Sequence, residues 1–355
     1  MIELRPTTDP RTRRDFVRLP AKRPYGTYDN DATAEAAWLT GTHTLNAGLA
    51  VTGVVAYAKG RPVGRIAVTT TTDSAGPDTH TAWVGFLEAP DGPTSDALFD
   101  WAHATAASLG RTRLVGPVDA SFWHRYRLKV SGFDERPYVG EPLNPPAHVT
   151  WWVRAGYEET DRYRSALYQR AEPGMVFPRF DERLARFEKR GFTFSHPTPD
   201  TWDQAMTDLH EMLHDLYAAM PTFRPLPLRT FLTHYARLKP VVDLSMVWLV
   251  HRNGRPEGFC VNLPDYGVGL TTGPTWRRLG TLARHKRRSD RYVLAYLGAR
   301  TPGLGSALMQ GLVTELATRR AAPIGSLTHV GVSSEGYGSE FIRTRNEYVL
   351  LARDV

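Results

Sequence analysis

Hydrophobic and polar positions change their period several times along the chain, and each change marks an expected element. Two β-branched runs between residues 48 and 71 flank Lys59-Gly60-Arg61-Pro62, a pattern that predicts a β-hairpin. Residues 81–89 predict a strand. Residues 94–110 predict a helix, because their large apolar side chains recur at helical spacing. The first half therefore begins with a hairpin, a strand and a helix.

The rest of the chain continues in the same way. Residues 112–119 predict a strand, and the segment that ends at residue 170 predicts a short helix, a Gly-Tyr turn and a closing strand. The second half predicts two helices, a hairpin around Asn253-Gly254-Arg255-Pro256, a long polar connection over 264–290, a strand, a helix and a last strand. The second half thus repeats the order of the first.

The hairpin tips support this repeat. Gly60-Arg61-Pro62-Val63-Gly64 and Gly254-Arg255-Pro256-Glu257-Gly258 are nearly the same, and each precedes a strand, a turn, an amphipathic helix and a strand. Self-similarity at a large offset indicates two copies of one fold. We expect an α/β protein with mixed sheets, divided into residues 1–170, a Pro- and charge-rich linker over 171–199, and residues 200–355.

A glycine turn in the second copy carries the clearest chemistry. Arg300-Thr301-Pro302-Gly303-Leu304-Gly305, an R-x-x-G-x-G pattern, joins the strand at 292–297 to an amphipathic helix. Glycines at the start of a helix let the backbone approach an anion, and the free N–H groups and the helix dipole attract it. The pattern predicts a pyrophosphate site. A glycine-capped turn without a ligand is the alternative. The Walker and Rossmann patterns are absent.

This arrangement resembles the coenzyme A loop of the GNAT superfamily of N-acyltransferases, whose signature is Q/R-x-x-G-x-G/A. The order of elements around 45–170 and 200–355 is also similar to that fold. The resemblance implies two tandem GNAT-like acyl-CoA N-acyltransferase domains, with acetyl-CoA or another acyl-CoA bound in the second. It implies backbone contacts to the thioester and the pyrophosphate from Leu297, Gly298, Arg300, Gly303, Leu304, Gly305 and Ser306.

The same resemblance implies direct transfer of the acyl group to the amine of a small molecule. The family's usual general acid is a tyrosine, and the position at the family's spacing falls near Phe341 in this chain. Tyr337 is the nearest phenol and becomes the candidate acid, with Glu335 as the candidate base. Both residues could instead be ordinary loop residues.

The first copy departs from the pattern. Its corresponding turn, Glu88-Ala89-Pro90-Asp91-Gly92-Pro93, has two carboxylates and two prolines where a pyrophosphate would need N–H donors. We expect a degenerate copy. A nearby stretch from Gly116 to Arg127, followed by Asn144-Pro145-Pro146, looks like a motif of large bacterial GNAT-like proteins. Its Trp123, His124 and Tyr126 are candidates for binding the acceptor, or anchors of a surface loop.

Composition and charge limit the partners. The 355 residues include one cysteine, and 44 basic against 37 acidic residues give a net charge of +7. The N-terminus lacks an apolar signal region, and the longest apolar run is too short to cross a bilayer. We expect a cytoplasmic protein without a membrane partner, and nucleic acid is an unlikely ligand. The basic cluster 284–288 is either a solvated loop or a phosphate contact.

Three other readings stay open. His210-Glu211-Met212-Leu213-His214 matches H-E-x-x-H, but a third ligand is not evident, so we expect no metal site. An aminoacyl-tRNA-dependent transferase can also have paired GNAT-like domains. The third is a binding protein that keeps acyl-CoA but has lost turnover, consistent with the missing tyrosine.

Overall fold

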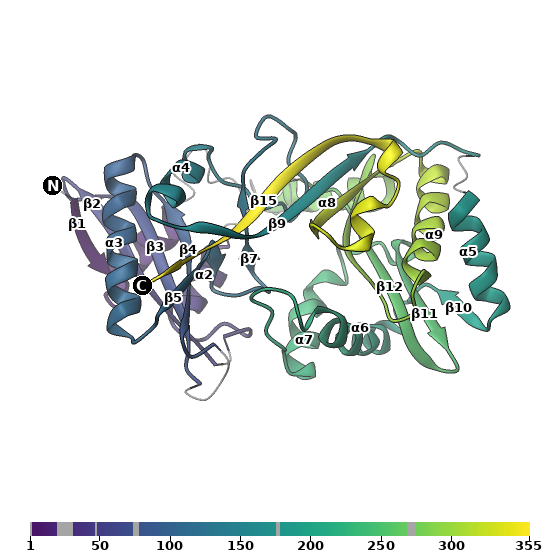
Figure 1. Ribbon diagram of the computed structural model, residues 1–355, viewed down its shortest axis with the longest axis horizontal. Coiled ribbons are helices and arrows are strands. Elements are labelled where there is room, and N and C mark those ends of the chain that lie inside the picture. Colours follow the sequence, from purple (N-terminus) through teal and green to yellow (C-terminus); the bar gives the residue numbers. More distant parts are fainter. Residues whose placement is uncertain (1, 20–30, 47, 74–77, 175–177, 268–274) are drawn as a thin grey trace. The chain divides into compact units, whose positions relative to one another are not determined.

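The computed structural model describes residues 2–19, 31–46, 48–73, 78–174, 178–267 and 275–355 (Figure 1). The chain forms two compact units. Unit 1 comprises residues 1–135, 142–162 and 347–355, and unit 2 comprises residues 136–141 and 163–346. Each unit contains a mixed sheet with helices packed on it, as the resemblance predicts.

The sheet of unit 1 contains the predicted hairpin. The chain turns at Lys59 and Gly60, whose φ angles of 50° and 73° suit a tight hairpin turn. The strands pair antiparallel up to β4, and β4 pairs parallel with β5 over only 81–83 and 113–115. The order is β1 (Ile2–Pro6), β2 (Leu49–Ala58), β3 (Arg61–Thr71), β4 (Thr81–Glu88), β5 (Arg113–Gly116), then the part of β15 (Ile342–Asp354) from residue 347 on.

Helices complete the core of unit 1. Asp91 caps α3 (Gly92–Ser108) by accepting a hydrogen bond from the Thr94 N–H. Leu98, Phe99 and Ala102 of α3 are buried among the apolar side chains of β2, β3 and β4. The unit also contains α1 (Pro10–Arg18), α2 (Ala32–Leu39) and α4 (Ala147–Arg154), together with the short strands β6 (Val118–Asp119), β7 (Arg125–Tyr126) and β8 (Leu128–Lys129).

Unit 2 repeats this order of elements. Its hairpin turns at Asn253 and Gly254, with φ angles of 51° and 76°. Strand β13 pairs antiparallel with β12, and parallel with β14 over only 291–294 and 322–325. The order is β10 (Phe192–Ser195), β11 (Val247–Arg252), β12 (Arg255–Pro264), β13 (Arg291–Ala299), β14 (Ala322–His329), then the part of β9 (Glu158–Tyr168) from residue 163 on.

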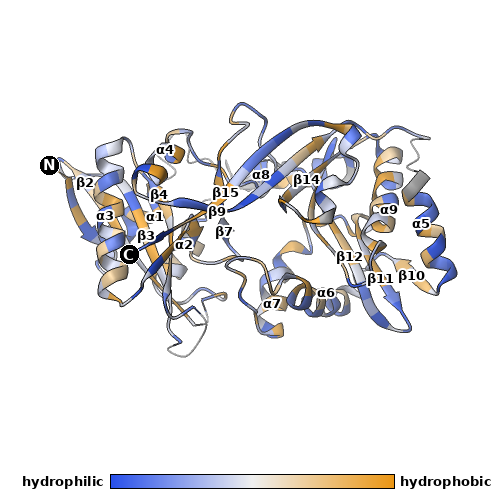
Figure 2. Cartoon of the chain, in the orientation of Figure 1, coloured by the Kyte–Doolittle hydropathy of each residue, from blue (hydrophilic) through white to orange (hydrophobic). Residues whose placement is uncertain are grey.

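Two helices cover opposite faces of this sheet. On one face, a side chain at Gly258 of β12 would meet Leu304 of α9 (Leu304–Arg319). On the other face, Phe259 lies close to Gly298, and Gly298 faces Leu216 of α6 (Trp202–Tyr217). Successive residues of a strand point to opposite faces, so α9 and α6 lie on different sides. Figure 2 shows apolar positions along both α9 and β12. The shorter α7 (Leu228–Tyr235) packs on α6.

The units exchange their closing strands. The strand that ends the first half, β9, pairs through Tyr163–Leu167 with β14 of unit 2. The last strand of the chain, β15, pairs through residues 351–354 with β5 of unit 1. The units therefore differ from the linear division into 1–170, 171–199 and 200–355 at their edges. Each half of the chain supplies the strand that completes the other sheet.

Two segments that the sequence predicted as connections contain helices and a strand. The segment predicted as a linker includes α5 (Pro178–Lys189) and β10, both within unit 2. Phe180, Leu184 and Phe187 of α5 pack against the cluster that contains α9. The prediction of a long loop over 264–290 is wrong for 275–288, which form α8 (Thr275–Arg288). Frequent charged residues, Arg186 and Arg284 among them, interrupt the apolar pattern of both segments.

Candidate functional site

The start of α9 has the geometry that the glycine turn predicts. Gly303 precedes the helix in the left-handed conformation, with φ of 84°, and no side chain of the described residues caps the helix there. A Cβ at Gly305 would lie 3.1 Å from the Tyr337 hydroxyl, so the turn accommodates only glycine comfortably. The Leu304 N–H donates to Thr301 O at 3.1 Å, so this predicted phosphate donor is already engaged.

Strand β13 opens beside this helix start. Its register with β12 shifts between residues 261 and 262, and its pairing with β14 stops at Leu294. Beyond that point the β14 edge of β13 has no strand partner among the described residues. The predicted thioester residues Leu297 and Gly298 lie on this free part, paired on their other edge with β12. The main chain there can offer N–H groups to a bound acyl group.

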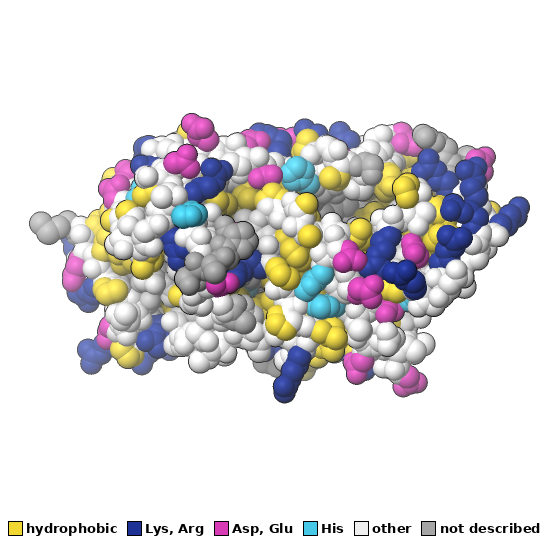
Figure 3. Space-filling model, turned by 60° about the horizontal axis from the view of Figure 1, so that its bottom comes forward, with side chains coloured by type: hydrophobic (Ala, Val, Ile, Leu, Met, Phe, Trp, Pro, Cys, Tyr) yellow, Lys and Arg dark blue, Asp and Glu magenta, His cyan; other side chains and the backbone are white. Residues whose placement is uncertain are grey.

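The sequence did not predict that the cationic side chain of Arg183 would lie at the start of α9. The Arg183 guanidinium of α5 donates to Ser306 Oγ at 2.7 Å and lies 4.0 Å from the position of a Cβ at Gly303. Ser306 is fully buried, and its hydroxyl donates to Gly303 O at 2.7 Å. The guanidinium adds charge-assisted donors to the backbone N–H groups at the start of α9, and we call these groups together the α9 cradle. Figure 3 shows Lys and Arg gathered on the right of the view, the side on which Figure 1 draws α5.

Arg300 has a different environment from the one expected of a phosphate contact. Its guanidinium donates to Pro256 O at 2.7 Å and forms ion pairs with Glu211 and Asp215 of α6. Its main-chain N–H donates to Glu257 O at 2.8 Å. These contacts join the glycine turn to α6 and the hairpin. The side chain of Arg300 therefore anchors the turn.

The two predicted proton-transfer residues lie on the segment after β14. The Tyr337 hydroxyl lies over Gly305, and its ring packs edge-on against Phe180. Glu335 accepts a hydrogen bond from the Gly331 N–H at 3.0 Å and pairs with Arg164 at 2.5 Å. That main-chain hydrogen bond, opposed by burial and aided by Arg164, lowers the pKa of Glu335. Its role as a base stays a prediction.

The H-E-x-x-H pattern forms a structural contact. The His214 Nε2 accepts a hydrogen bond from the Leu226 N–H at 3.1 Å, and the His210 Nε2 lies 2.7 Å from Leu226 O. Glu211 pairs with Arg300. Within the described ranges, no group of three or more His, Cys, Asp and Glu residues could hold a metal ion.

The turn of unit 1 that corresponds to the cradle is filled by protein groups. Arg154 donates to Gly92 O at 3.0 Å and pairs with Asp96, and a Cβ at Gly92 would lie 2.8 Å from its guanidinium. Asp91 adds a carboxylate as the helix cap. That this copy lacks a pyrophosphate site stays a prediction.

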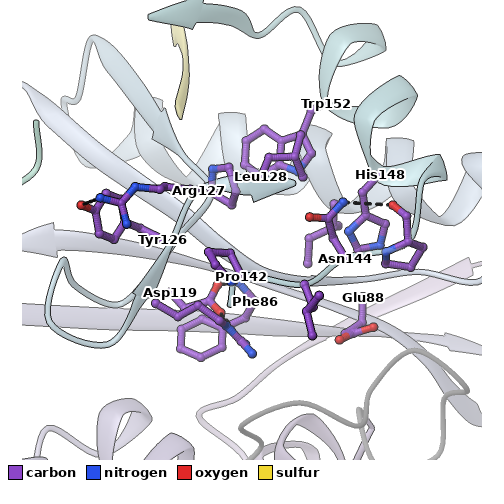
Figure 4. Close-up of a pocket in the computed structure, with 15 residues that line it drawn as sticks. Phe86, Glu88, Asp119, Tyr126, Arg127, Leu128, Pro142, Asn144, His148 and Trp152 are labelled. Carbon is purple, nitrogen blue, oxygen red and sulfur yellow. Dashed lines mark hydrogen bonds and ion pairs between the residues drawn. The ribbon is translucent and has the colours of Figure 1, made fainter. Parts of the chain in front are cut away.

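Unit 1 nevertheless has a pocket where β4 and β5 separate (Figure 4). The pocket contains about 570 Å³ of space, including open solvent at its mouth. The separation follows from the short pairing of β4 with β5 and from Phe86, whose φ is 57°. Its lining comes from β4, the stretch 117–128, the segment 142–145 and α4: Phe86, Leu87, Glu88, Pro117, Asp119, Arg125, Tyr126, Arg127, Leu128, Pro142, Leu143, Asn144, Pro145, His148 and Trp152.

The stretch after Gly116 thus forms a cavity wall, although its three candidate residues have different positions. Tyr126 lines the pocket, and its ring lies under the Arg127 guanidinium at 3.7 Å. Trp123 is buried against Phe122, and His124 lies near Trp38. Neither Trp123 nor His124 is among the lining residues.

Two buried groups set the electrostatics of the pocket. Asp119 is 6 % exposed, pairs with Arg125 at 2.5 Å and accepts the Phe86 N–H. Burial opposes its ionisation, but Arg125 and that hydrogen bond lower the pKa of Asp119 below its usual range. His148 is 5 % exposed. Burial lowers the pKa of His148 to about 4, although Asp119 acts in the opposite direction. His148 is therefore neutral at neutral pH.

The buried histidine predicts a loss of stability in acid. An unfolded His titrates near 6.5, so between pH 6.5 and about 4 the unfolded chain binds more protons than the native one. The free energy of unfolding should therefore fall as the pH falls through this window, by at most about 3 kcal/mol from His148. Urea unfolding at pH 7 and pH 4.5 should show a smaller loss for His148→Gln. The exposed His80→Gln is the control, and an equal loss in both variants would contradict the prediction.

Comparison with known sequences gives two partial matches, and no family model matches the chain. The chain is 27 % identical to a bacterial ceramide synthase from Caulobacter vibrioides over 187 residues, 52 % of this chain and 48 % of that protein. It is 25 % identical to Protein YghO of Escherichia coli over 220 residues, 61 % of this chain and 55 % of that protein. The chain spans about half the length of the curated relatives that it matches.

Solved structures match over the whole chain. A tandem GNAT protein from the clavulanic acid biosynthesis pathway aligns with a TM-score of 0.52 at 14 % identity, covering 100 % of this chain and 98 % of that one. A GCN5-related N-acetyltransferase from Sphaerobacter thermophilus aligns with a TM-score of 0.51 at 12 % identity, covering 99 % and 95 %. The chain has the fold of tandem GNAT acetyltransferases, which confirms the predicted fold class. No described helix is long and apolar enough to cross a membrane.

Proposed function

We propose that unit 2 binds an acyl-coenzyme A and transfers its acyl group directly to the amine of a small molecule. The observation that carries this proposal is the start of α9. Gly303, in the left-handed conformation, precedes a helix that no described side chain caps. The Arg183 guanidinium and the part of β13 without a described strand partner on its β14 edge lie beside it. Backbone donors and a cation at a helix start suit a pyrophosphate. A free strand edge next to it suits the thioester arm.

One partial relative supports acyl transfer to nitrogen. One of them is named a ceramide synthase, and a ceramide is an amide of a fatty acid and a long-chain amine. The structural neighbours are N-acetyltransferases, so the fold hosts the same reaction with a short acyl group. The donor in our proposal is therefore acetyl-CoA or a longer acyl-CoA.

The chain's own residues would position the reactants. N–H groups of β13 near Leu297 and Gly298 would stabilise the negative charge that develops on the thioester oxygen. The Tyr337 hydroxyl, beside Gly305, would donate a hydrogen bond at the mouth of the cradle. The acyl-CoA itself supplies an activated acyl group with a thiolate leaving group.

A turnover assay tests the proposal. The full chain is incubated with acetyl-CoA or palmitoyl-CoA and a panel of primary amines, and released thiol and N-acylated product are measured. Amide formation with thiol release supports the proposal. Binding without thiol release from any amine would favour a silent acyl-CoA-binding protein. Failure to bind either thioester, together with tRNA binding, would favour an aminoacyl-tRNA-dependent transferase.

Arg183 provides a sharper prediction. Replacing Arg183 by Met keeps the apolar stem but removes the guanidinium beside Ser306. A hydrogen bond to a charged group contributes about 1.5–3 kcal/mol, so affinity for acetyl-CoA should fall roughly 10- to 100-fold. Isothermal titration calorimetry measures the change. Arg186→Met on the exposed face of α5 is the matched control, and an equal loss there would show that only overall charge matters.

A further inference from the structure

The pocket of unit 1 contains a buried polar atom for which no described residue provides a hydrogen bond. His148 lines the pocket and is 5 % exposed, and its Nε2 has no hydrogen-bond partner among the described residues. In Figure 4 the ring points into the pocket from α4. Leaving such an atom unsatisfied costs about 1–3 kcal/mol. The cost is recovered when a ligand supplies the missing hydrogen bond.

The position of this atom distinguishes it from a similar one elsewhere in unit 1. The Nε2 of His103 is also buried and has no hydrogen-bond partner among the described residues. His103 packs against Phe99 and Tyr157 and is not a lining residue of the pocket. An unsatisfied histidine alone therefore does not define a site. His148 combines that property with an open cavity.

The charges in the pocket favour an uncharged ligand. The carboxylate of Asp119 is neutralised by Arg125 at 2.5 Å, and the Arg127 guanidinium lies over the Tyr126 ring. The lining also contains Glu88, which has its own interaction within the chain, and the apolar side chains of Phe86, Leu128 and Trp152. A charged ligand would lose its hydration without gaining an opposite charge at His148.

The hydrogen bond that His148 Nε2 lacks among the described residues further limits the chemical class of the ligand. A neutral imidazole carries one N–H, so Nε2 is either a donor or an acceptor, depending on the tautomer. An amide or a hydroxyl group can both donate and accept. Such a group can hydrogen-bond to Nε2 in either tautomer, while the hydrocarbon part of the ligand contacts the apolar side chains of the pocket.

We propose that the pocket of unit 1 is a ligand-binding site for an uncharged molecule whose amide or hydroxyl group hydrogen-bonds to His148 Nε2. The site lies within unit 1 and is separate from the α9 cradle of unit 2. The proposal does not depend on acyl transfer. If unit 2 has no acyltransferase activity, ligand binding in the pocket of unit 1 can still be tested by itself.

Three small probes of nearly the same shape test this proposal on the full chain: isobutyramide, isobutyrate and isobutylammonium. The ring Cε1–H signals of selectively ¹³C-labelled histidines are followed during each titration. We expect isobutyramide to shift the His148 signal saturably and to leave the His103 signal unchanged. We expect the two charged probes to bind at least about tenfold more weakly.

Variants provide a second measurement. Ligand-observed NMR should show that His148→Phe, which keeps a planar ring of somewhat larger size without a polar nitrogen, loses isobutyramide binding. His103→Phe, the matched control outside the pocket, should retain it. The absence of a saturable shift in the wild type would overturn the proposal, and so would equal binding of isobutyrate. Equal shifts of His148 and His103 would also overturn it, since they would indicate non-specific solvation.

Discussion

Acetyl-CoA binding is expected to survive Gly303→Asn and to be lost in Gly303→Asp. The two side chains have nearly the same shape, and after glycine Asn and Asp are the residues that best tolerate a left-handed conformation such as the φ of 84° at this position. Only Asp adds a negative charge where the pyrophosphate would lie. Its carboxylate would also attract the Arg183 guanidinium, 4.0 Å from the Cβ position, away from a phosphate.

The size of this effect makes it measurable. Two like charges about 4 Å apart repel by about 4 kcal/mol at an effective dielectric constant near 20, roughly a thousandfold in affinity. At acetyl-CoA concentrations a hundredfold above Kd, binding should raise the free energy of unfolding of the wild type and of Gly303→Asn by about 2.7 kcal/mol. Each kcal/mol raises the Tm by about 2–4 °C in a chain of this size. Gly303→Asp should show no shift.

The Asn variant also separates backbone strain from charge. If both variants lose binding, the glycine itself is required and the charge argument is not tested by this pair. In that case Arg183→Met decides between a phosphate cradle and a turn that is only structural. If Gly303→Asp binds as tightly as wild type, the cofactor does not occupy the start of α9.

Unit 1 is expected to lose about 3–5 kcal/mol of stability in Arg65→Met. Arg65 and Glu35 are each 1 % exposed and form an ion pair at 2.5 Å. The Arg65 guanidinium also donates to Phe16 O at 2.9 Å and lies over the Phe16 ring, so it joins β3 to α1 and α2. Removing one partner of a buried pair leaves an uncompensated charge, which costs more than the pair contributes.

The double variant Arg65→Met/Glu35→Met should recover most of the loss, because it leaves no buried charge. The exposed pair Arg5–Glu3 is the control, and Arg5→Met should change stability far less than Arg65→Met. Urea unfolding gives the total change, and amide hydrogen exchange shows whether unit 1 opens first. A double variant as unstable as Arg65→Met would mean that the lost contacts to Phe16, and not the bare carboxylate, cause the effect.

The sequence was informative where local chemistry decides the structure. The hairpins at Lys59-Gly60 and Asn253-Gly254 form as predicted, because these residues adopt the positive φ angles of a tight turn. The glycine turn before α9 also forms as predicted, with Gly303 in the left-handed conformation. The unequal first copy was visible from Asp91 and the prolines around it.

Tertiary structure decided which distant residues meet. Arg183 reaches α9 from a segment that appeared to be a linker, since its apolar residues are diluted by charges. Arg300 pairs with two carboxylates more than 80 positions away along the chain. The exchange of β9 and β15 was equally hidden, because a strand's sequence specifies its period but not its partner.

The sequence by itself therefore determined the order of elements, the repeat and the glycine turn before α9, all of which depend on neighbouring residues. The folded chain alone decided the pocket around His148. That pocket combines β4, the stretch 117–128, residues 142–145 and α4. Its burial, its Asp119–Arg125 pair and a His148 nitrogen without a hydrogen-bond partner among the described residues arise only when these segments pack together, and no local pattern encodes them.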